Sequence, residues 1–187
     1  MVRSVRAPGE EGFADTGLLD KPRGGNSPDR GVRSVLFQVA NPGASAEAID
    51  SKVATRLRRR EVFEQATPPL LWAILHEACL RTVVGNAEVM LLQLEYLLKV
   101  AASPHITLQV MPFSAGAPTP HMKPFTVLHF TGSPSVLYTE SRVGGRMHDS
   151  AQTVDAAMDD YDLLRANASS PDQSVALIKT LLKEFRP

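Results

Sequence analysis

The stretch FTVLHFTGSPSVLYTE, residues 125–140, decides the fold class of this chain. Apolar, aromatic and β-branched residues gather in two short runs, 125–130 and 136–140, which are separated by a turn containing Gly132 and Pro134. Two such runs joined by so short a turn are typical of an antiparallel β-hairpin. The sequence therefore predicts a hairpin here and, around it, a small sheet that is mainly antiparallel.

Two further strands are expected upstream of the hairpin. Residues 70–77, LLWAILHE, form a short apolar run after two prolines, and the tryptophan in it, Trp72, is expected in the core. Residues 106–111, ITLQVM, alternate apolar with polar side chains. Because a predicted helix from Asn86 to about residue 102 separates these strands, they are candidates for a parallel pair. The whole sheet should then have about four strands.

Three more helices are predicted from capping signals and apolar spacing. They cover residues 45–65, 150–168 and 170–185. Ser45 and Ser150 are candidate N-caps, and Ser170 with Gln173 matches the capping-box pattern. The expected fold class is therefore α/β of the α+β type, with helices packed against a small, mainly antiparallel sheet.

The first 41 residues differ in texture from the rest of the chain. Their prolines and glycines are too closely spaced for long helices or strands. Residues 1–41 are therefore expected to be a poorly structured leader with a linker-like character, and residues 42–187 a single α/β domain of ordinary size. A hydrophobic content of 43% is enough to build a core.

Composition argues against several classes of protein. Twenty basic residues balance 20 acidic ones, whereas a dedicated nucleic-acid binder usually carries a basic excess. No apolar run approaches the roughly 18 residues that cross a bilayer, and the N-terminus lacks the apolar part of a secretion signal. Cys79 is the only cysteine, and its apolar neighbours predict a buried thiol. These features indicate a cytoplasmic protein.

The histidines form no metal-binding motif. The chain has no HxH, HExxH or CxxC spacing among His76, His105, His121, His129 and His148 and its one cysteine. The sequence therefore predicts neither a metal site nor another cofactor.

Residues 112–121 and 141–149 are expected to be loops. The second contains Gly144 and Gly145 between two arginines, but the strand and helix that flank a phosphate-binding loop are missing around it. We interpret this segment as a flexible turn.

Five stretches, in a fixed order along the chain, carry a resemblance to a known family. They are TRLRRREVFEQATPPLLWAILHEACLRTVVGNAEVMLLQLEYLL, ITLQVMPFSAGAP, PFTVLHF, VLYTES and SPDQSVALIKTLLKEF, and they span about residues 45–186. The chain resembles the C-terminal domain of actinobacterial XRE-type helix-turn-helix transcriptional regulators, which are described as antitoxin-like. That domain is catalogued as one of unknown function.

The resemblance implies a regulatory role. In the family, DNA-binding helices precede this domain and are joined to it by a stretch similar to PGLLQTPEYARAVL, of which residues 17–19 and 32–36 are only a partial counterpart. The DNA-reading helices have no counterpart in this chain, which argues against direct DNA binding. The resemblance thus implies an effector- or partner-sensing domain that binds a small molecule or a small toxin-like protein. The short apolar runs of the chain predict no membrane partner.

Polar residues near the strand ends are candidates for the site that such a domain would need. The candidates for ligand binding are Glu77, Arg81, Tyr138, Glu140, His121 and His148. Glu77 and Arg81 lie four residues apart after the first strand, and Arg81 could clamp an anion. Tyr138 and Glu140 alternate on the last strand and so share one face of it. In the resembling family, corresponding positions also carry an acid and an arginine, and a tyrosine and a glutamate.

Several of these candidates have an alternative explanation. Glu77 and Arg81 could form a structural ion pair that holds the turn. Glu77 and Glu140 could instead serve as acid–base carboxylates of an enzyme in secondary metabolism that reused this domain. The basic cluster Arg56, Arg58, Arg59 and Arg60 is a weak candidate for contact with nucleic acid. The alternative is that these arginines form a solvated face of the predicted helix. The helices at 45–65 and 170–185 are candidate surfaces for a homodimer.

Overall fold

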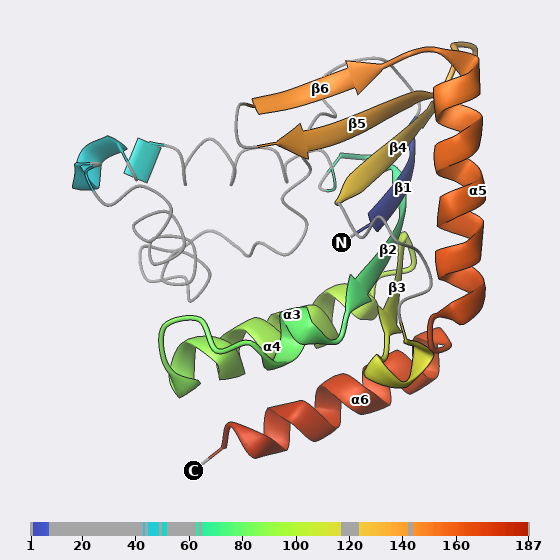
Figure 1. Cartoon of the computed structure of the whole chain (residues 1–187). Coiled ribbons are helices and arrows are strands. Elements are labelled where there is room, and N and C mark those ends of the chain that lie inside the picture. Colours follow the sequence, from blue (N-terminus) through green and yellow to red (C-terminus); the bar gives the residue numbers. More distant parts are fainter. Residues whose placement is uncertain are drawn as a thin grey trace.

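The computed structural model describes residues 2–7, 43, 45–48, 50–51, 63, 65–116, 124–141 and 144–186. Its centre is a six-stranded sheet with the strand order β3-β2-β1-β4-β5-β6 (Figure 1). The strands are β1 (Val2–Ala7), β2 (Leu70–His76), β3 (Ile106–Met111), β4 (Phe125–Phe130), β5 (Val136–Ser141) and β6 (Gly144–His148).

The pairing of the strands is mixed but mainly antiparallel. β2 and β3 form a parallel pair, whereas β4, β5 and β6 follow one another in antiparallel pairs. β1 joins these two parts, because it pairs antiparallel with β2 and parallel with β4. The predicted α+β class and the hairpin of β4 with β5 are thus confirmed, and β2 and β3, the candidates for a parallel pair, are parallel. The sheet has six strands rather than the expected four or so, because it also contains β1 and β6.

β1 falls within residues 1–41, for which the sequence predicts little regular structure. Residues 2–7 form a strand inside the sheet, with a neighbouring strand on each side. A six-residue segment followed by closely spaced breakers carries no local signal of this pairing, because both partner strands lie far away along the chain. Residues 8–41 are outside the described part of the chain, so the prediction for them stays a prediction.

β6 also differs from the expectation drawn from the sequence. Residues 141–149 are predicted to be a loop, yet Gly144–His148 pairs with β5 as an edge strand. Glycine is depleted in strands, but Gly145 meets a steric need here. A Cβ atom at Gly145 would overlap the ring of Tyr138 on β5. Packing across two strands, rather than local propensity, decides this strand.

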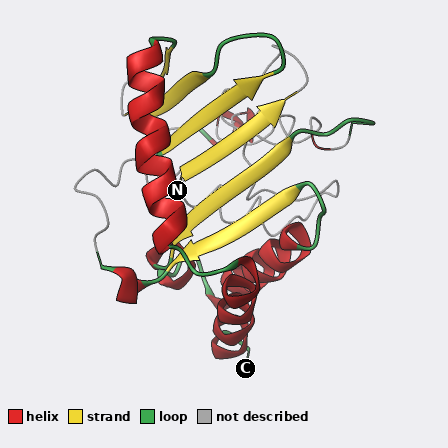
Figure 2. Ribbon diagram, turned by 90° about the vertical axis from the view of Figure 1, so that its right-hand side faces the viewer, coloured by secondary structure: helices red, strands yellow, loops and turns green. Residues whose placement is uncertain are grey.

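Helices cover both faces of the sheet (Figure 2). α5 (Ala151–Asn167) runs across one face, and α4 (Ala87–Ala101) and α6 (Pro171–Glu184) pack on the other face and against each other beside β3. The short α3 (Ala78–Arg81) follows β2, and the 3-10 turn η2 (Phe113–Ala115) follows β3. In the described part of the chain, no helix has the length and apolar character needed to cross a membrane.

The long helices α4, α5 and α6 begin at the residues that the sequence predicts, although Ser150, the predicted cap of α5, makes no side-chain hydrogen bond there. The side chain of Asn86 accepts a hydrogen bond from the backbone at the start of α4. Ser170 and Gln173 form the predicted capping box of α6. Ser45 accepts a hydrogen bond from the N–H of Ala48, and residues 46–48 are helical. Local sequence signals thus suffice to place these helix starts.

Each face of the sheet has its own apolar core. Between the sheet and helices α4 and α6, the largest fully buried side chains include Leu75, Leu94, Leu97, Val110, Ile178 and Leu181. On the opposite face, Ile74 and Met111 pack against Tyr161 and Leu164 of α5. Neighbouring residues of β2 therefore face different cores, as the alternation of side chains along a strand requires.

Cys79 is exposed, which makes the prediction of a buried thiol wrong. The single turn of α3 buries the neighbouring Leu80 in the core and leaves Cys79 on the outer side. Apolar neighbours in the sequence indicate burial only where the periodicity of the element places all of them on the same face.

The outer edge of β3 is closed by the segment that leads into α6. The N–H of Ser169 donates to the carbonyl of Val110 at 2.9 Å, and the hydroxyl of Ser174 accepts from the N–H of Val110 at 2.8 Å. Ser174 is fully buried and also donates to the carbonyl of Ser170 at 2.8 Å. These bonds satisfy the backbone N–H and carbonyl of Val110 at the outer edge of β3 and hold the start of α6 against this strand.

Replacing Ser174 with alanine is therefore expected to lower the free energy of unfolding by about 2 kcal/mol, because the N–H of Val110 loses its acceptor in a buried position. Chemical denaturation of both proteins measures this difference. The matched control is Thr180→Val, which removes an exposed hydroxyl from the same helix and should change stability by less than about 0.5 kcal/mol. An equally small effect of Ser174→Ala would contradict the role given to this hydroxyl.

Candidate functional site

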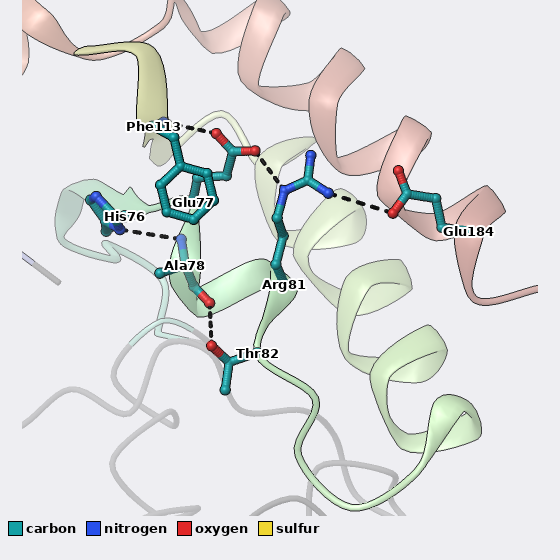
Figure 3. A network of polar contacts seen from close by, with 7 residues as sticks. All are labelled: His76, Glu77, Ala78, Arg81, Thr82, Phe113 and Glu184. Carbon is teal, nitrogen blue, oxygen red and sulfur yellow. Dashed lines mark hydrogen bonds and ion pairs between the residues drawn. The ribbon is translucent and has the colours of Figure 1, made fainter. Parts of the chain in front are cut away.

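Glu77 is the centre of a polar network at the end of β2 (Figure 3). One carboxylate oxygen accepts from Nε of Arg81 at 2.6 Å, and the other accepts from the backbone N–H of Phe113 at 2.9 Å. Arg81 also reaches Glu184 of α6, with Nη1 and Oε2 3.5 Å apart. The network thus ties the end of β2 to the segment after β3 and to α6.

The surroundings of Glu77 keep its carboxylate ionised. Glu77 is buried, which by itself raises the pKa, but the N–H of Phe113 and the guanidinium of Arg81 together bring that pKa below its ordinary value. Both carboxylate oxygens already have partners within the fold. The geometry therefore supports a structural ion pair more than a pair of ligand-binding groups.

Tyr138 and Glu140 lie on β5, away from this network. β1 and β4 stand between β2 and β5, which places the two strands about 14 Å apart at the usual strand spacing. The structure therefore does not bring Glu77 and Glu140 together as a close pair of carboxylates. Tyr138 lies against Gly145 of the neighbouring strand β6.

The remaining candidates do not join these residues in one site. Nε2 of His148 lies 3.1 Å from Oγ1 of Thr139, on the opposite face of β5 from Tyr138 and Glu140. His121 and the basic cluster Arg56, Arg58, Arg59 and Arg60 lie outside the described residues. Among the described residues, no group of three or more His, Cys, Asp or Glu could hold a metal ion.

A pocket of about 450 Å³ lies instead between the sheet and the C-terminal half of α5. We call it the α5 pocket. Its aromatic and polar lining residues are Trp72, His105, Thr107, His129, Tyr161 and Arg165. They come from β2, β3 and the turn before it, β4, and α5, and none of the described lining residues is acidic. The volume is within the range of pockets that hold small molecules.

Trp72 is held in place by polar contacts on both sides. Its indole N–H donates to the side-chain oxygen of Gln109 at 2.7 Å, and Gln109 donates to the carbonyl of Ser169 at 2.8 Å. The guanidinium of Arg165 lies over the indole ring, 4.9 Å from its centre. Trp72 is half-buried rather than fully enclosed in the core. The pocket thus has a rigid aromatic wall with a cation beside it.

Tyr161 contributes a buried hydroxyl with no hydrogen-bond partner among the described residues. The residue is only 2% exposed, and burial raises the pKa of its hydroxyl well above the ordinary value, so the group is a neutral donor at physiological pH. An unsatisfied buried hydroxyl costs about 1–3 kcal/mol. Tyr161 is among the residues that line the α5 pocket, so a molecule bound there is one candidate for the missing partner, and an ordered water is another.

The sequence points to this pocket only weakly. Tyr161 and Arg165 lie four residues apart and so share one face of a predicted helix, but this spacing is common on surface helices. The sequence predicts Trp72 to be a core residue, and His105 and His129 belong to no recognisable motif. The four elements that carry these residues meet only in the folded sheet, so a local pattern could not have assembled them.

Comparison with known proteins identifies a family but no characterised relative. A family profile described as "Domain of unknown function (DUF5753)" matches residues 32–180, which is most of the chain. No curated protein and no solved structure matches. The matched span includes every described helix and strand except β1 and the last residues of α6. The chain therefore belongs to the DUF5753 family of domains.

Proposed function

We propose that this chain is a regulatory domain of the kind found in antitoxin-like, XRE-type helix-turn-helix regulators, and that it binds a small-molecule effector in the α5 pocket. The single observation that carries the proposal is this pocket, with its fixed indole, its guanidinium and its unsatisfied hydroxyl. The regulatory role is supported by the five sequence stretches that resemble, in the same order, the C-terminal domain of these regulators. A few polar groups converging on an apolar cleft are the usual features of a ligand site.

The position of the pocket suits a regulatory role. α5 forms one wall with Tyr161 and Arg165, and its C-terminal end leads directly to Ser169, which is bonded to β3. A molecule that contacts both the sheet and α5 would favour one placement of this helix over others. Such a ligand shifts the population of conformations in proportion to its difference in affinity between them.

Binding is better supported than catalysis. An enzyme that used Glu77 and Glu140 as an acid–base pair would need both carboxylates in one pocket. Glu77 is instead engaged by Phe113 and Arg81, and Glu140 lies three strands away. The α5 pocket contains no carboxylate among its described lining residues.

A small toxin-like partner protein is the second candidate for what this domain senses. The edge strand β6 favours it, because Met147 on this strand is 54% exposed and no described strand covers the outer edge. Exposed strand edges accept an added strand from a partner. A gene for a small toxin-like protein beside the gene for this chain would favour this alternative.

Filling the α5 pocket tests the small-molecule proposal. The measurement is the melting temperature with a set of small aromatic and aliphatic compounds that includes anions, neutral molecules and cations. At least one compound should raise the melting temperature of the protein, because a ligand that binds only the folded state stabilises it. The same compound should have no effect on Thr107→Phe, since the larger side chain would occupy the pocket.

The matched control for this experiment is Thr180→Phe. It places the same side chain at an exposed position of α6, and its response to the compound should equal that of the unaltered protein. Fluorescence of Trp72, the only tryptophan in the chain, gives a second readout from within the pocket. If no compound raises the melting temperature, or if the effect persists in Thr107→Phe, the proposal is overturned.

A further inference from the structure

The charge of the α5 pocket indicates the class of molecule that it selects. We propose that the pocket selects small organic acids that carry a flat aromatic ring, with the carboxylate bound by Arg165 and the ring packed along Trp72. This inference rests on the proposed function, because it assigns the chemistry of the same site.

The polar groups of the pocket are mainly donors. Arg165 is the one described lining residue with a full charge, and it presents several N–H groups in a plane that matches a carboxylate. Tyr161 adds a neutral hydroxyl that lacks a partner among the described residues. No described acidic side chain lines the pocket, so an ammonium group would meet the positive charge of Arg165, which only the exposed Asp162 outside the lining offsets. A ligand with acceptor oxygens and a negative charge fits this arrangement best.

Arg165 can take a new anionic partner at little cost. Its Nη2 lies 3.3 Å from Oδ1 of Asp162, and both side chains are exposed, at 44% and 59%. Exposed ion pairs of this kind contribute little, so a ligand carboxylate can compete with Asp162. The contact with Trp72 restrains the guanidinium beside the pocket, which reduces the entropy lost on binding.

The rest of the wall suits an aromatic ring. Trp72 of the sheet is fixed by Gln109, and Met158 and Tyr161 of α5 also line the pocket. Aromatic and thioether surfaces make favourable contacts with a flat ring. A ligand oxygen within reach of the Tyr161 hydroxyl would also supply the acceptor that this buried group lacks.

Calorimetric titration with three matched compounds tests the inference on the full chain. The compounds are biphenyl-4-carboxylate, biphenyl-4-carboxamide and the cation biphenyl-4-ylmethylammonium, which share one ring system and differ in charge. The carboxylate should bind about tenfold more tightly than the amide, and the ammonium compound should bind least tightly, because a charge-assisted hydrogen bond is about twice as strong as a neutral one.

Variants of the pocket identify the groups responsible. Arg165→Gln should weaken carboxylate binding about tenfold and leave amide binding nearly unchanged. Asp162→Asn should tighten carboxylate binding, because it removes the competing carboxylate of the chain. The control Arg186→Gln removes an exposed arginine near Glu95, outside the pocket, and should change neither affinity.

Tyr161→Phe separates a binding role from a structural one. The variant should be at least as stable as the unaltered protein, since the lost hydroxyl has no partner among the described residues. Its affinity for both oxygen-bearing compounds should nevertheless fall several-fold. A loss of stability without a loss of affinity would overturn the part assigned to this residue.

The inference is overturned if none of the three compounds binds, if the amide or the ammonium compound binds as tightly as the carboxylate, or if Arg165→Gln leaves the preference for the carboxylate intact. An experiment that disproves the preference for acids can be distinguished from one that disproves the small-molecule site itself. A neutral or cationic compound that binds the protein but not Thr107→Phe would retain the pocket as a small-molecule site and remove only its preference for acids.

Discussion

Replacing Leu181 with alanine is expected to lower the free energy of unfolding by about 3 kcal/mol, as measured by chemical denaturation. Leu181 is fully buried at the centre of the core between the sheet and helices α4 and α6. The substitution removes three carbon atoms from a closely packed region and leaves a cavity that the surrounding side chains fill only in part. Because α6 also closes the edge of β3, the loss should destabilise the sheet as well as the helix.

The same substitution at an exposed leucine provides the control. Leu163 of α5 is 45% exposed, and Leu163→Ala should change the free energy of unfolding by less than about 0.5 kcal/mol. Comparable losses from the two variants would mean that α6 does not pack on the sheet as described.

Replacing Glu77 with alanine is expected to lower the free energy of unfolding by about 2 kcal/mol. The main loss is the hydrogen bond from the N–H of Phe113, because a bond to a charged acceptor contributes about 1.5–3 kcal/mol. The pairing with Arg81 adds less, since the arginine side chain is 41% exposed and screened by solvent. Glu184→Ala is the matched control: it removes the exposed acid of the same network and should cost less than about 0.5 kcal/mol.

The contribution of Glu77 should depend on pH. The pKa of Glu77 is lower in the folded chain than its ordinary value of 4.5, so the carboxylate stabilises the fold above this value. This stabilisation is lost as the pH falls through the folded-state pKa. The stability gap between the unaltered protein and Glu77→Gln should thus be largest near neutral pH and narrow in acid. A gap that stays constant, or widens in acid, would contradict an ionised Glu77 in the folded state.

These results bear on how the domain would work as a regulator. Glu77, Ser174 and Leu181 hold the sheet to α6 on one face, whereas the α5 pocket lies on the other face. Substitutions in the first group should reduce stability without changing the ligand preference of the pocket. Arg165→Gln should instead change the ligand preference of the pocket without reducing stability, because Arg165 is exposed and lies outside both cores.

Sequence patterns predict the local elements of this protein well. The strand Ile106–Met111 has the bounds that its alternation indicates, and the Ser170–Gln173 capping box begins the last helix as expected. The hairpin of β4 with β5 follows from the short turn between two apolar runs. In each case the signal and the structure that it specifies lie within a few residues of each other, so backbone preferences and nearby hydrogen bonds are sufficient.

The sequence alone determined the fold class, the β4–β5 hairpin and the starts of the long helices, because each depends on periodicity, turns and caps over short distances. The tertiary structure decided the central place of β1, the strand identity of β6, the separation of Glu77 from Glu140, and the meeting of Trp72, His129 and Arg165 in one pocket. Those features depend on which distant segments pair in the sheet. Strand order is set by hydrogen bonds and packing between segments far apart in the chain, which no local pattern encodes.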